Sequence, residues 1–168
     1  MDPRNLQSVY AHLRRAEARA CVGASPPDFL MWISALGVPT ELVELFATCW
    51  PQSQIDVVPF QLFEPAQLRK DPDLPRLLAH RLLVLGCCPN GDPLVLDLAT
   101  DAWVPGAVEH GLLWGDEPED ADPRVYHRPI ARSFGELLDR LAAEKWVPRD
   151  YWDAQGWDAE DPDRGARG

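Results

Sequence analysis

Four histidines could act as bases or metal ligands: His12, His80, His110 and His127. Zinc sites and many catalytic sites place imidazoles at fixed spacings, such as two histidines four residues apart on one helix face. None of the four has a second histidine or a cysteine at such a spacing. His127 follows Tyr126 in a stretch with the composition of a strand, where a hydrogen-bonded structural histidine is more common than a ligand. We therefore expect no metal ion and no cofactor.

The cysteines do not form a recognisable reactive motif. Cys87 and Cys88 are adjacent, without the two-residue spacer of a redox pair, so we expect reduced thiols in a turn or in the core. Cys21 and Cys49 add no spacing typical of a disulfide framework, which favours a reducing, cytoplasmic compartment.

Asp92 and Asp97 resemble a catalytic carboxylate pair only in sequence. Five residues apart on a strand they point to opposite faces, because side chains alternate along a strand. We expect Asp92 to accept hydrogen bonds from turn amides and Asp97 from the neighbouring loop. The sequence contains no phosphate-binding glycine loop and no Gly-x-Ser-x-Gly motif. These observations predict no catalytic residues, and a protein that is not an enzyme.

An acidic segment follows the apolar run 112–114. Residues 116–122 hold five carboxylates, and the predicted partner-binding site consists of Trp114, Asp116, Glu117, Glu119, Asp120 and Asp122. One interpretation is a solvated loop with Trp114 turned into the core, which is how charge runs usually behave. The other is a protein interface, in which the tryptophan supplies binding energy and the carboxylates speed the encounter with a basic partner. Both interpretations remain open from the sequence.

Composition limits the class of protein. The chain has 168 residues, 46% of them hydrophobic, which is enough for one domain with a sizeable core. Its formal net charge of −11 argues against nucleic acid and anionic membranes as partners, because both would repel it. No apolar run reaches the roughly 18 residues of a membrane-spanning helix, and the polar start does not resemble a secretory signal.

The central element is a predicted β-hairpin over residues 81–98. Two apolar runs, Leu82–Leu85 and Leu94–Leu98, flank Asn90-Gly91. That pair predicts a type I′ turn, since both residues tolerate positive φ. The continuous first run is typical of a central strand covered on both faces.

The other elements follow from periodicity, capping residues and prolines. Helices are predicted over residues 4–22, 29–36 (capped by Asp28 and ended by Gly37), 40–47, 64–68 and after Ser133. Strands are predicted over 55–63, broken or edged by Pro59, around 103–104 before a turn at Pro105-Gly106, and over 124–127. Residues 70–75 are predicted to be a loop. Ser133 and Glu136 predict a capping box for the last helix, whose core face is Phe134, Leu137, Leu138 and Leu141.

Three stretches occur in an order that resembles the SUKH superfamily, which contains a yeast cell-wall-synthesis regulator and many bacterial immunity proteins. They are Leu-Gly-Val-Pro-Thr-Glu-Leu at 36–42, the hairpin strand with Gly91-Asp92 and Leu96-Asp97, and Ser-Phe-Gly-Glu-Leu-Leu at 133–138. The resemblance covers roughly residues 25–145. It implies an α+β fold, with a twisted, mostly antiparallel sheet and helices packed around it. Residues 1–150 would form the domain, and 151–168 an acidic, partly frayed tail.

The resemblance also implies a function in protein binding. The leading hypothesis is an immunity protein that neutralises a bacterial polymorphic or contact-dependent toxin, such as a basic nuclease whose cleft an acidic surface can fill. The alternative is an intracellular regulatory or scaffolding module without a toxin partner. Both are inferred by analogy of fold, and both expect a basic protein as partner.

Overall fold

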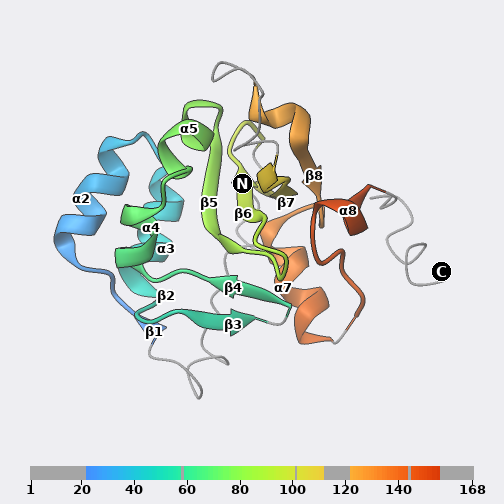
Figure 1. The fold of residues 1–168 in the computed structure, drawn as a ribbon. Helices are drawn as coiled ribbons and strands as arrows, with labels where there is room; N and C mark the ends of the chain where they lie inside the picture. The colour runs from blue at the N-terminus through green and yellow to red at the C-terminus, as the bar shows by residue number, and fades with distance from the viewer. Residues whose placement is uncertain (1–21, 58, 101, 112–121, 144, 156–168) are drawn as a thin grey trace.

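A six-stranded antiparallel sheet forms the centre of the computed structural model, which describes residues 22–57, 59–100, 102–111, 122–143 and 145–155 (Figure 1). The strands lie in space in the order in which they follow along the chain. They are β3 (Ile55–Val57), β4 (Phe60–Leu62), β5 (Leu82–Cys87), β6 (Pro93–Asp97), β7 (Val104–Val108) and β8 (His127–Pro129). A separate two-stranded sheet pairs β1 (Val22–Gly23) with β2 (Trp50–Pro51).

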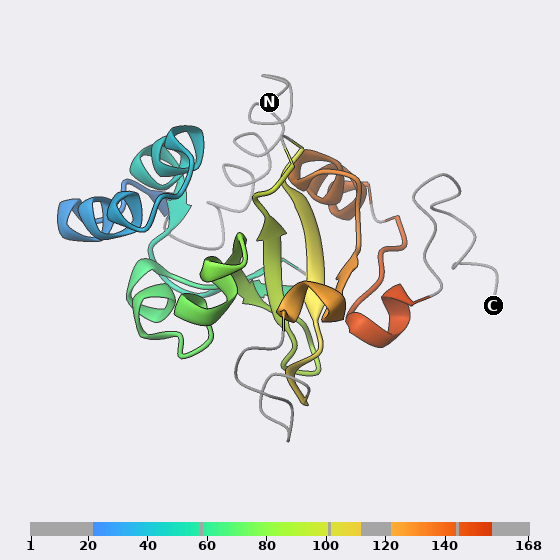
Figure 2. The ribbon, with the colours of Figure 1, turned by 90° about the horizontal axis from the view of Figure 1, so that it is seen from above.

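Helices lie on both sides of the large sheet (Figure 2). Those that precede β5 gather on one side: α2 (Pro27–Ala35), α3 (Thr40–Thr48), α4 (Pro65–Lys70) and α5 (Leu74–Ala79). On the other side lie α7 (Phe134–Ala142) and α8 (Tyr151–Ala154). A short 3₁₀ helix, η1 (Pro123–Tyr126), leads directly into β8. The chain therefore has an α+β fold with an antiparallel sheet, as predicted. None of the helices in the described ranges is long and apolar enough to cross a membrane.

Strands β5 and β6 form the predicted hairpin at the middle of the sheet. All four side chains of Leu82–Leu85 are buried, as expected for a strand covered on both faces. The pairing with β6 shifts register between Val84 and Gly86, which marks a β-bulge. At Gly86 a Cβ atom would overlap the backbone carbonyl of Gln61, so the close approach of β4 requires glycine here.

The predicted type I′ turn at the end of this hairpin is wrong. Gly91 has a φ of +94°, but Asn90 is not among the residues with positive φ. The N–H of Gly91 donates to the carbonyl of Cys88, and the N–H of Cys88 donates to the carbonyl of Asp92. The loop therefore has three residues, because Pro89 has the fixed φ that suits an ordinary type I turn and Gly91 supplies the left-handed residue after it.

Of the two predicted N-caps, Asp28 is wrong, because the N-cap of α2 is Pro26, and Ser133 is only partly correct. Helix α2 begins after Pro26, and Asp28 lies in its first turn, where its carboxylate accepts a hydrogen bond from Arg69. The hydroxyl of Ser133 accepts a hydrogen bond from the N–H of Glu136, as predicted for the start of α7. The second half of the capping box is missing, because the Glu136 carboxylate binds the backbone and guanidinium of Arg132. Of the predicted core face of α7, Leu141 is only partly buried.

Several predicted strand and loop boundaries are corrected. The predicted break of the 55–63 strand at Pro59 is confirmed, and the two parts, β3 and β4, pair with each other. The turn predicted at Pro105-Gly106 is wrong, because both residues lie inside β7. The carbonyl of Pro105 points toward β8 and accepts the N–H of Ile130. In an antiparallel strand the N–H and C=O of a residue point to the same side, so the N–H that proline lacks would not have bonded to β6. Residues 124–126 belong to η1 and not to a strand.

The remaining differences concern helices. Helix α5 begins at Leu74, inside the predicted loop 70–75. Helix α8 occupies the start of the predicted tail, and its Tyr151 and Ala154 are buried. The helix predicted over 4–22 lies outside the described residues except for Val22, which belongs to β1.

Candidate functional site

Of the predicted partner-binding residues, the structure describes Asp122. Trp114, Asp116, Glu117, Glu119 and Asp120 lie outside the described residues. Asp122 caps η1: its carboxylate accepts a hydrogen bond from the Arg124 N–H at 2.9 Å. The same oxygen lies 3.1 Å from Nδ1 of His80, at the end of α5. Half of the Asp122 side chain remains exposed, so the last carboxylate of the acidic segment is both anchored and accessible.

An arginine–carboxylate ion pair fixes η1 to the sheet. Both terminal nitrogens of Arg124 donate to the carboxylate of Asp97 at the end of β6, at 3.1 and 2.7 Å. Arg124 also donates to the carbonyl of His80. Asp97 accepts the N–H of Ala99, which confirms its predicted bond to the neighbouring loop. Two-pronged arginine–carboxylate pairs fix geometry as well as charge, so η1 is held in a defined position.

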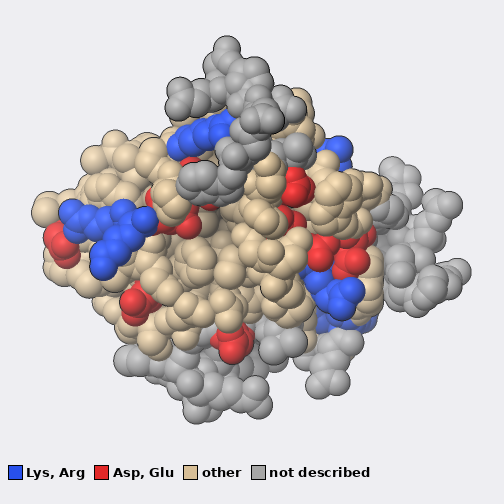
Figure 3. Space-filling view, viewed as in Figure 1, with Lys and Arg blue, Asp and Glu red and all other residues tan. Residues whose placement is uncertain are grey.

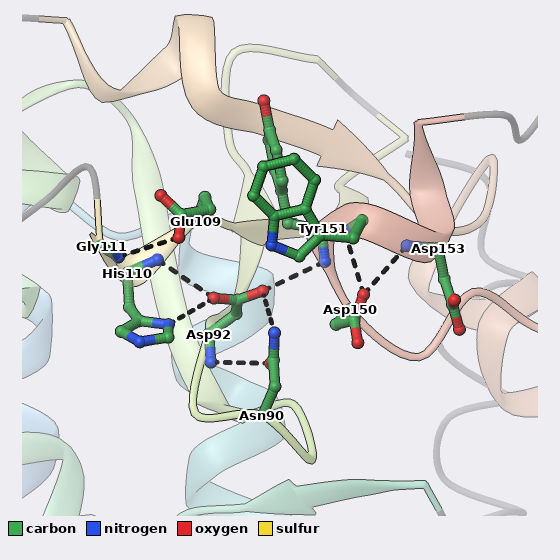
Figure 4. Close-up of polar contacts among 9 residues, drawn as sticks. Asn90, Asp92, Glu109, His110, Gly111, Asp150, Tyr151 and Asp153 are labelled. Carbon is green, nitrogen blue, oxygen red and sulfur yellow. Dashed lines mark hydrogen bonds and ion pairs between the residues drawn. The ribbon is translucent and has the colours of Figure 1, made fainter.

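Asp92 is the centre of a second group of polar contacts (Figure 4). Its carboxylate is fully buried at the hairpin end and accepts four hydrogen bonds. One oxygen accepts from the backbone N–H and the ring Nδ1 of His110, at 3.1 and 2.6 Å. The other accepts from the side chain of Asn90 at 2.8 Å and from the N–H of Tyr151 at 3.2 Å. The hydrogen bonds of Asp92 thus link the β5–β6 hairpin to His110, just after β7, and to Tyr151 at the start of α8.

The charge of Asp92 is stabilised by these donors. Burial alone would raise the pKa of the carboxyl, but the hydrogen bonds from Asn90, His110 and Tyr151 lower the pKa below its usual range. The resulting stabilisation is present above the pKa of the unfolded chain and is lost as the pH falls through the lower pKa of the folded state. The predicted bond from a turn residue is confirmed at Asn90, whereas the contacts with His110 and Tyr151 are too distant in sequence to be predicted.

Asp92→Ala is expected to lower the free energy of unfolding by about 2 kcal/mol, because hydrogen bonds to a charged group are lost and the buried Tyr151 N–H keeps no acceptor. Amide exchange across α8 should become faster than in the wild type. Asp150→Ala is the matched control: it removes only the cap of α8 and should cost about 1 kcal/mol. Denaturant unfolding and hydrogen exchange measure both effects. An unchanged α8 in the Asp92 variant would contradict this role.

One group of side chains in the described ranges has ligand atoms close enough together to hold a cation: Asp92, Glu109 and His110. These atoms all lie within 4.8 Å of one another. Both oxygens of Asp92 already accept two hydrogen bonds each. The Glu109 carboxylate accepts the N–H of Gly111. A cation would have to replace the contact between His110 and Asp92, so the geometry is that of a structural hydrogen-bond group.

His127 differs from the prediction of a hydrogen-bonded histidine. Its Nε2 is buried and has no partner among the described residues, and a Cβ on Gly106 would overlap it. Burial lowers the pKa of His127 to about 4, with the cations of Arg124 and Arg128 acting in the same direction and Asp97 opposing them. The ring is therefore neutral at pH 7.

Cys87 and Cys88 are free thiols, as predicted. Burial raises the pKa of both thiols, and nearby carboxylates add to the shift. Both line an open depression of about 400 Å³ between the β3–β4 and β5–β6 hairpin ends. Protonated thiols are poor nucleophiles, so these two cysteines are not activated for nucleophilic attack.

Comparison of the chain with protein-family models, with curated proteins and with solved structures gives no match. The fold, the anchored end of the acidic segment and the surface around it therefore carry the functional argument.

Proposed function

We propose that the chain is an immunity protein that binds and neutralises a basic bacterial protein toxin, the function implied by the resemblance to the SUKH superfamily. The observation that carries the proposal is the anchoring of Asp122. His80 and the η1 backbone hold this carboxylate half-exposed, and the Arg124–Asp97 pair holds η1. The fold thus fixes Asp122, the last of the five carboxylates in residues 116–122, at the protein surface.

Charge supports a basic protein as the partner. The net charge of −11 repels nucleic acid and attracts a protein whose own cleft binds nucleic acid. A nuclease toxin presents such a cleft, and filling it with carboxylates blocks the substrate directly.

The experiment uses the purified chain and a basic toxin encoded next to its gene, prepared as a catalytically inactive variant for binding and in active form for inhibition. Calorimetry should show a stable complex, and the chain should abolish toxin activity at stoichiometric amounts. Absence of binding, or binding that leaves the toxin fully active, would contradict the proposal.

Neutralising Asp116, Glu117, Glu119 and Asp120 to their amides should slow association on the order of tenfold at low salt and flatten its salt dependence. Dissociation should change little, because exposed charges act mainly on the encounter. The control variant neutralises Glu41, Glu44, Asp56 and Asp139, which are exposed and change the net charge equally. Surface plasmon resonance at two ionic strengths measures both rates. Equal slowing in both variants would show that net charge alone matters.

A further inference from the structure

Exposed apolar side chains occur on both η1 and α8, and the N–H of Val125 on η1 donates to the carbonyl of the anchored Asp122. Among the described residues the exposed large hydrophobic side chains are Met31, Leu36, Val125 and Trp152. Met31 lies on α2 and Leu36 directly follows that helix, while Val125 lies on η1 and Trp152 on α8. Val125 is 57% exposed and Trp152 is 61% exposed. An exposed tryptophan is a costly choice for a surface with no partner, because its apolar area is large.

Contacts of Arg128 connect η1, which carries Val125, with α8, which carries Trp152. Arg128, on β8, donates to the carbonyl of Val125 at 3.1 Å. Its guanidinium lies over the ring of Tyr151, 5.3 Å from the ring centre. The rings of Tyr151 and Trp152 meet edge to face, with centres 5.3 Å apart. We call Val125, Arg128, Tyr151 and Trp152 the η1–α8 surface.

Both ends of the η1–α8 surface are held rigidly. Tyr151 is 6% exposed, and its N–H donates to the buried carboxylate of Asp92. Asp150 caps α8 through the N–H groups of Trp152 and Asp153. The Arg124–Asp97 pair holds η1. Trp152 is therefore exposed on a helix whose backbone is held in place by hydrogen bonds. A preorganised aromatic side chain loses little entropy on binding.

The charges around the surface indicate its partner. Asp122 precedes η1 and is half-exposed. Asp150, the N-cap of α8, and Asp153 flank Trp152 in the sequence. Figure 3 shows acidic side chains in the region of α8, with basic side chains directly beside them. Arg149 is engaged by Asp153 at 2.8 Å, and Arg128 by Tyr151 and backbone carbonyls. The carboxylate of Asp122 is half-exposed and lies close in the chain to the exposed Val125, whose N–H donates to the Asp122 carbonyl.

We propose that the η1–α8 surface is where the basic toxin docks, with Trp152 seated in an apolar pocket that basic side chains surround. This inference rests on the proposed function and adds the location of the interface to it. Tryptophan is enriched among the few residues that dominate binding energy, and such residues lie inside a ring of polar contacts.

The test uses the full chain and the inactive basic toxin described above. Trp152→Ala should raise the dissociation rate by about 30-fold or more, while association changes less than about twofold. Val125→Ala should raise dissociation by a smaller factor, and Trp152→Phe should restore part of the affinity. Met31→Ala, at an equally exposed apolar side chain on α2, is the control and should behave as the wild type. Thermal unfolding of each variant shows that the fold is retained.

The outcomes separate this inference from the proposed function. If the wild type binds the toxin and the Trp152 and Val125 variants dissociate at its rate, the interface lies elsewhere and the inference is wrong. If the wild type does not bind, the proposed function fails and the inference with it. If light scattering shows a dimer of this chain that Trp152→Ala dissociates, the surface joins two copies, which also overturns the inference.

Discussion

Replacing Trp50 by alanine is expected to lower the free energy of unfolding by about 3–5 kcal/mol, the usual cost of deleting a large buried aromatic side chain. Trp50 is fully buried where β2, the end of α3 and the start of α4 meet. Its ring lies 4.5 Å from that of Phe46, centre to centre, and Phe46 contacts Phe29 in turn. Its indole N–H donates to the carbonyl of Phe63 at 2.9 Å. Alanine would leave a cavity and remove the donor.

Two further variants divide this cost. Trp50→Phe keeps most of the packing and removes the hydrogen bond, so it should cost about 1 kcal/mol from that bond plus a smaller packing loss. Trp152→Ala removes the same side chain from an exposed position and should stay within about 0.5 kcal/mol of the wild type. Denaturant unfolding measures all three. A Trp50→Ala variant as stable as Trp152→Ala would show that the helices before β5 do not pack as described.

The free energy of unfolding is expected to fall by up to about 3 kcal/mol between pH 6.5 and pH 4 because of His127 alone. Its folded pKa of about 4 lies below the ordinary value of 6.5. Above pH 6.5 the ring is neutral in both states and contributes nothing. Between these values the unfolded chain binds a proton that the folded chain does not, so acid favours unfolding. Below the folded pKa the loss is complete.

A non-titrating variant isolates this effect from the carboxylates that also titrate toward pH 4. Denaturant unfolding of the wild type and of His127→Gln at pH 7, 6, 5 and 4.5 gives the difference at each pH. The wild type should lose more stability than the variant over this range. Parallel curves would show that the His127 ring is protonated in the folded state.

Local sequence signals predicted much of the fold. Continuous apolar residues placed β5 at the centre of the sheet, and Ser133 placed the start of α7. The turn after β5 was predicted in place but not in type, because the Asn-Gly pair outweighed the constraint that Pro89 puts on φ. Pro105 was predicted to end a strand, since the direction of its carbonyl is visible only when β8 is present.

The contacts that position the candidate site are long-range and have no local signal. Asp92 meets the N–H of Tyr151, which is 59 residues away in sequence, and Arg124 meets Asp97, which is 27 residues away. Helix α8 has four residues and is stabilised by these tertiary contacts rather than by helix propensity. Trp152 was therefore assigned to an acidic, partly frayed tail. The pairing of Trp152 with aspartates at 150 and 153 was a signal of the same kind as the one that favoured Trp114.

The most direct test of the central claim is hydrogen exchange of the chain with and without the inactive basic toxin. Binding should slow exchange in residues 123–129 and 151–155, which hold the η1–α8 surface, and should leave exchange in residues 27–35 of α2 unchanged. Slowed exchange confined to α2 or to the β3–β4 hairpin would contradict the claim, as would an exchange pattern that the toxin does not alter.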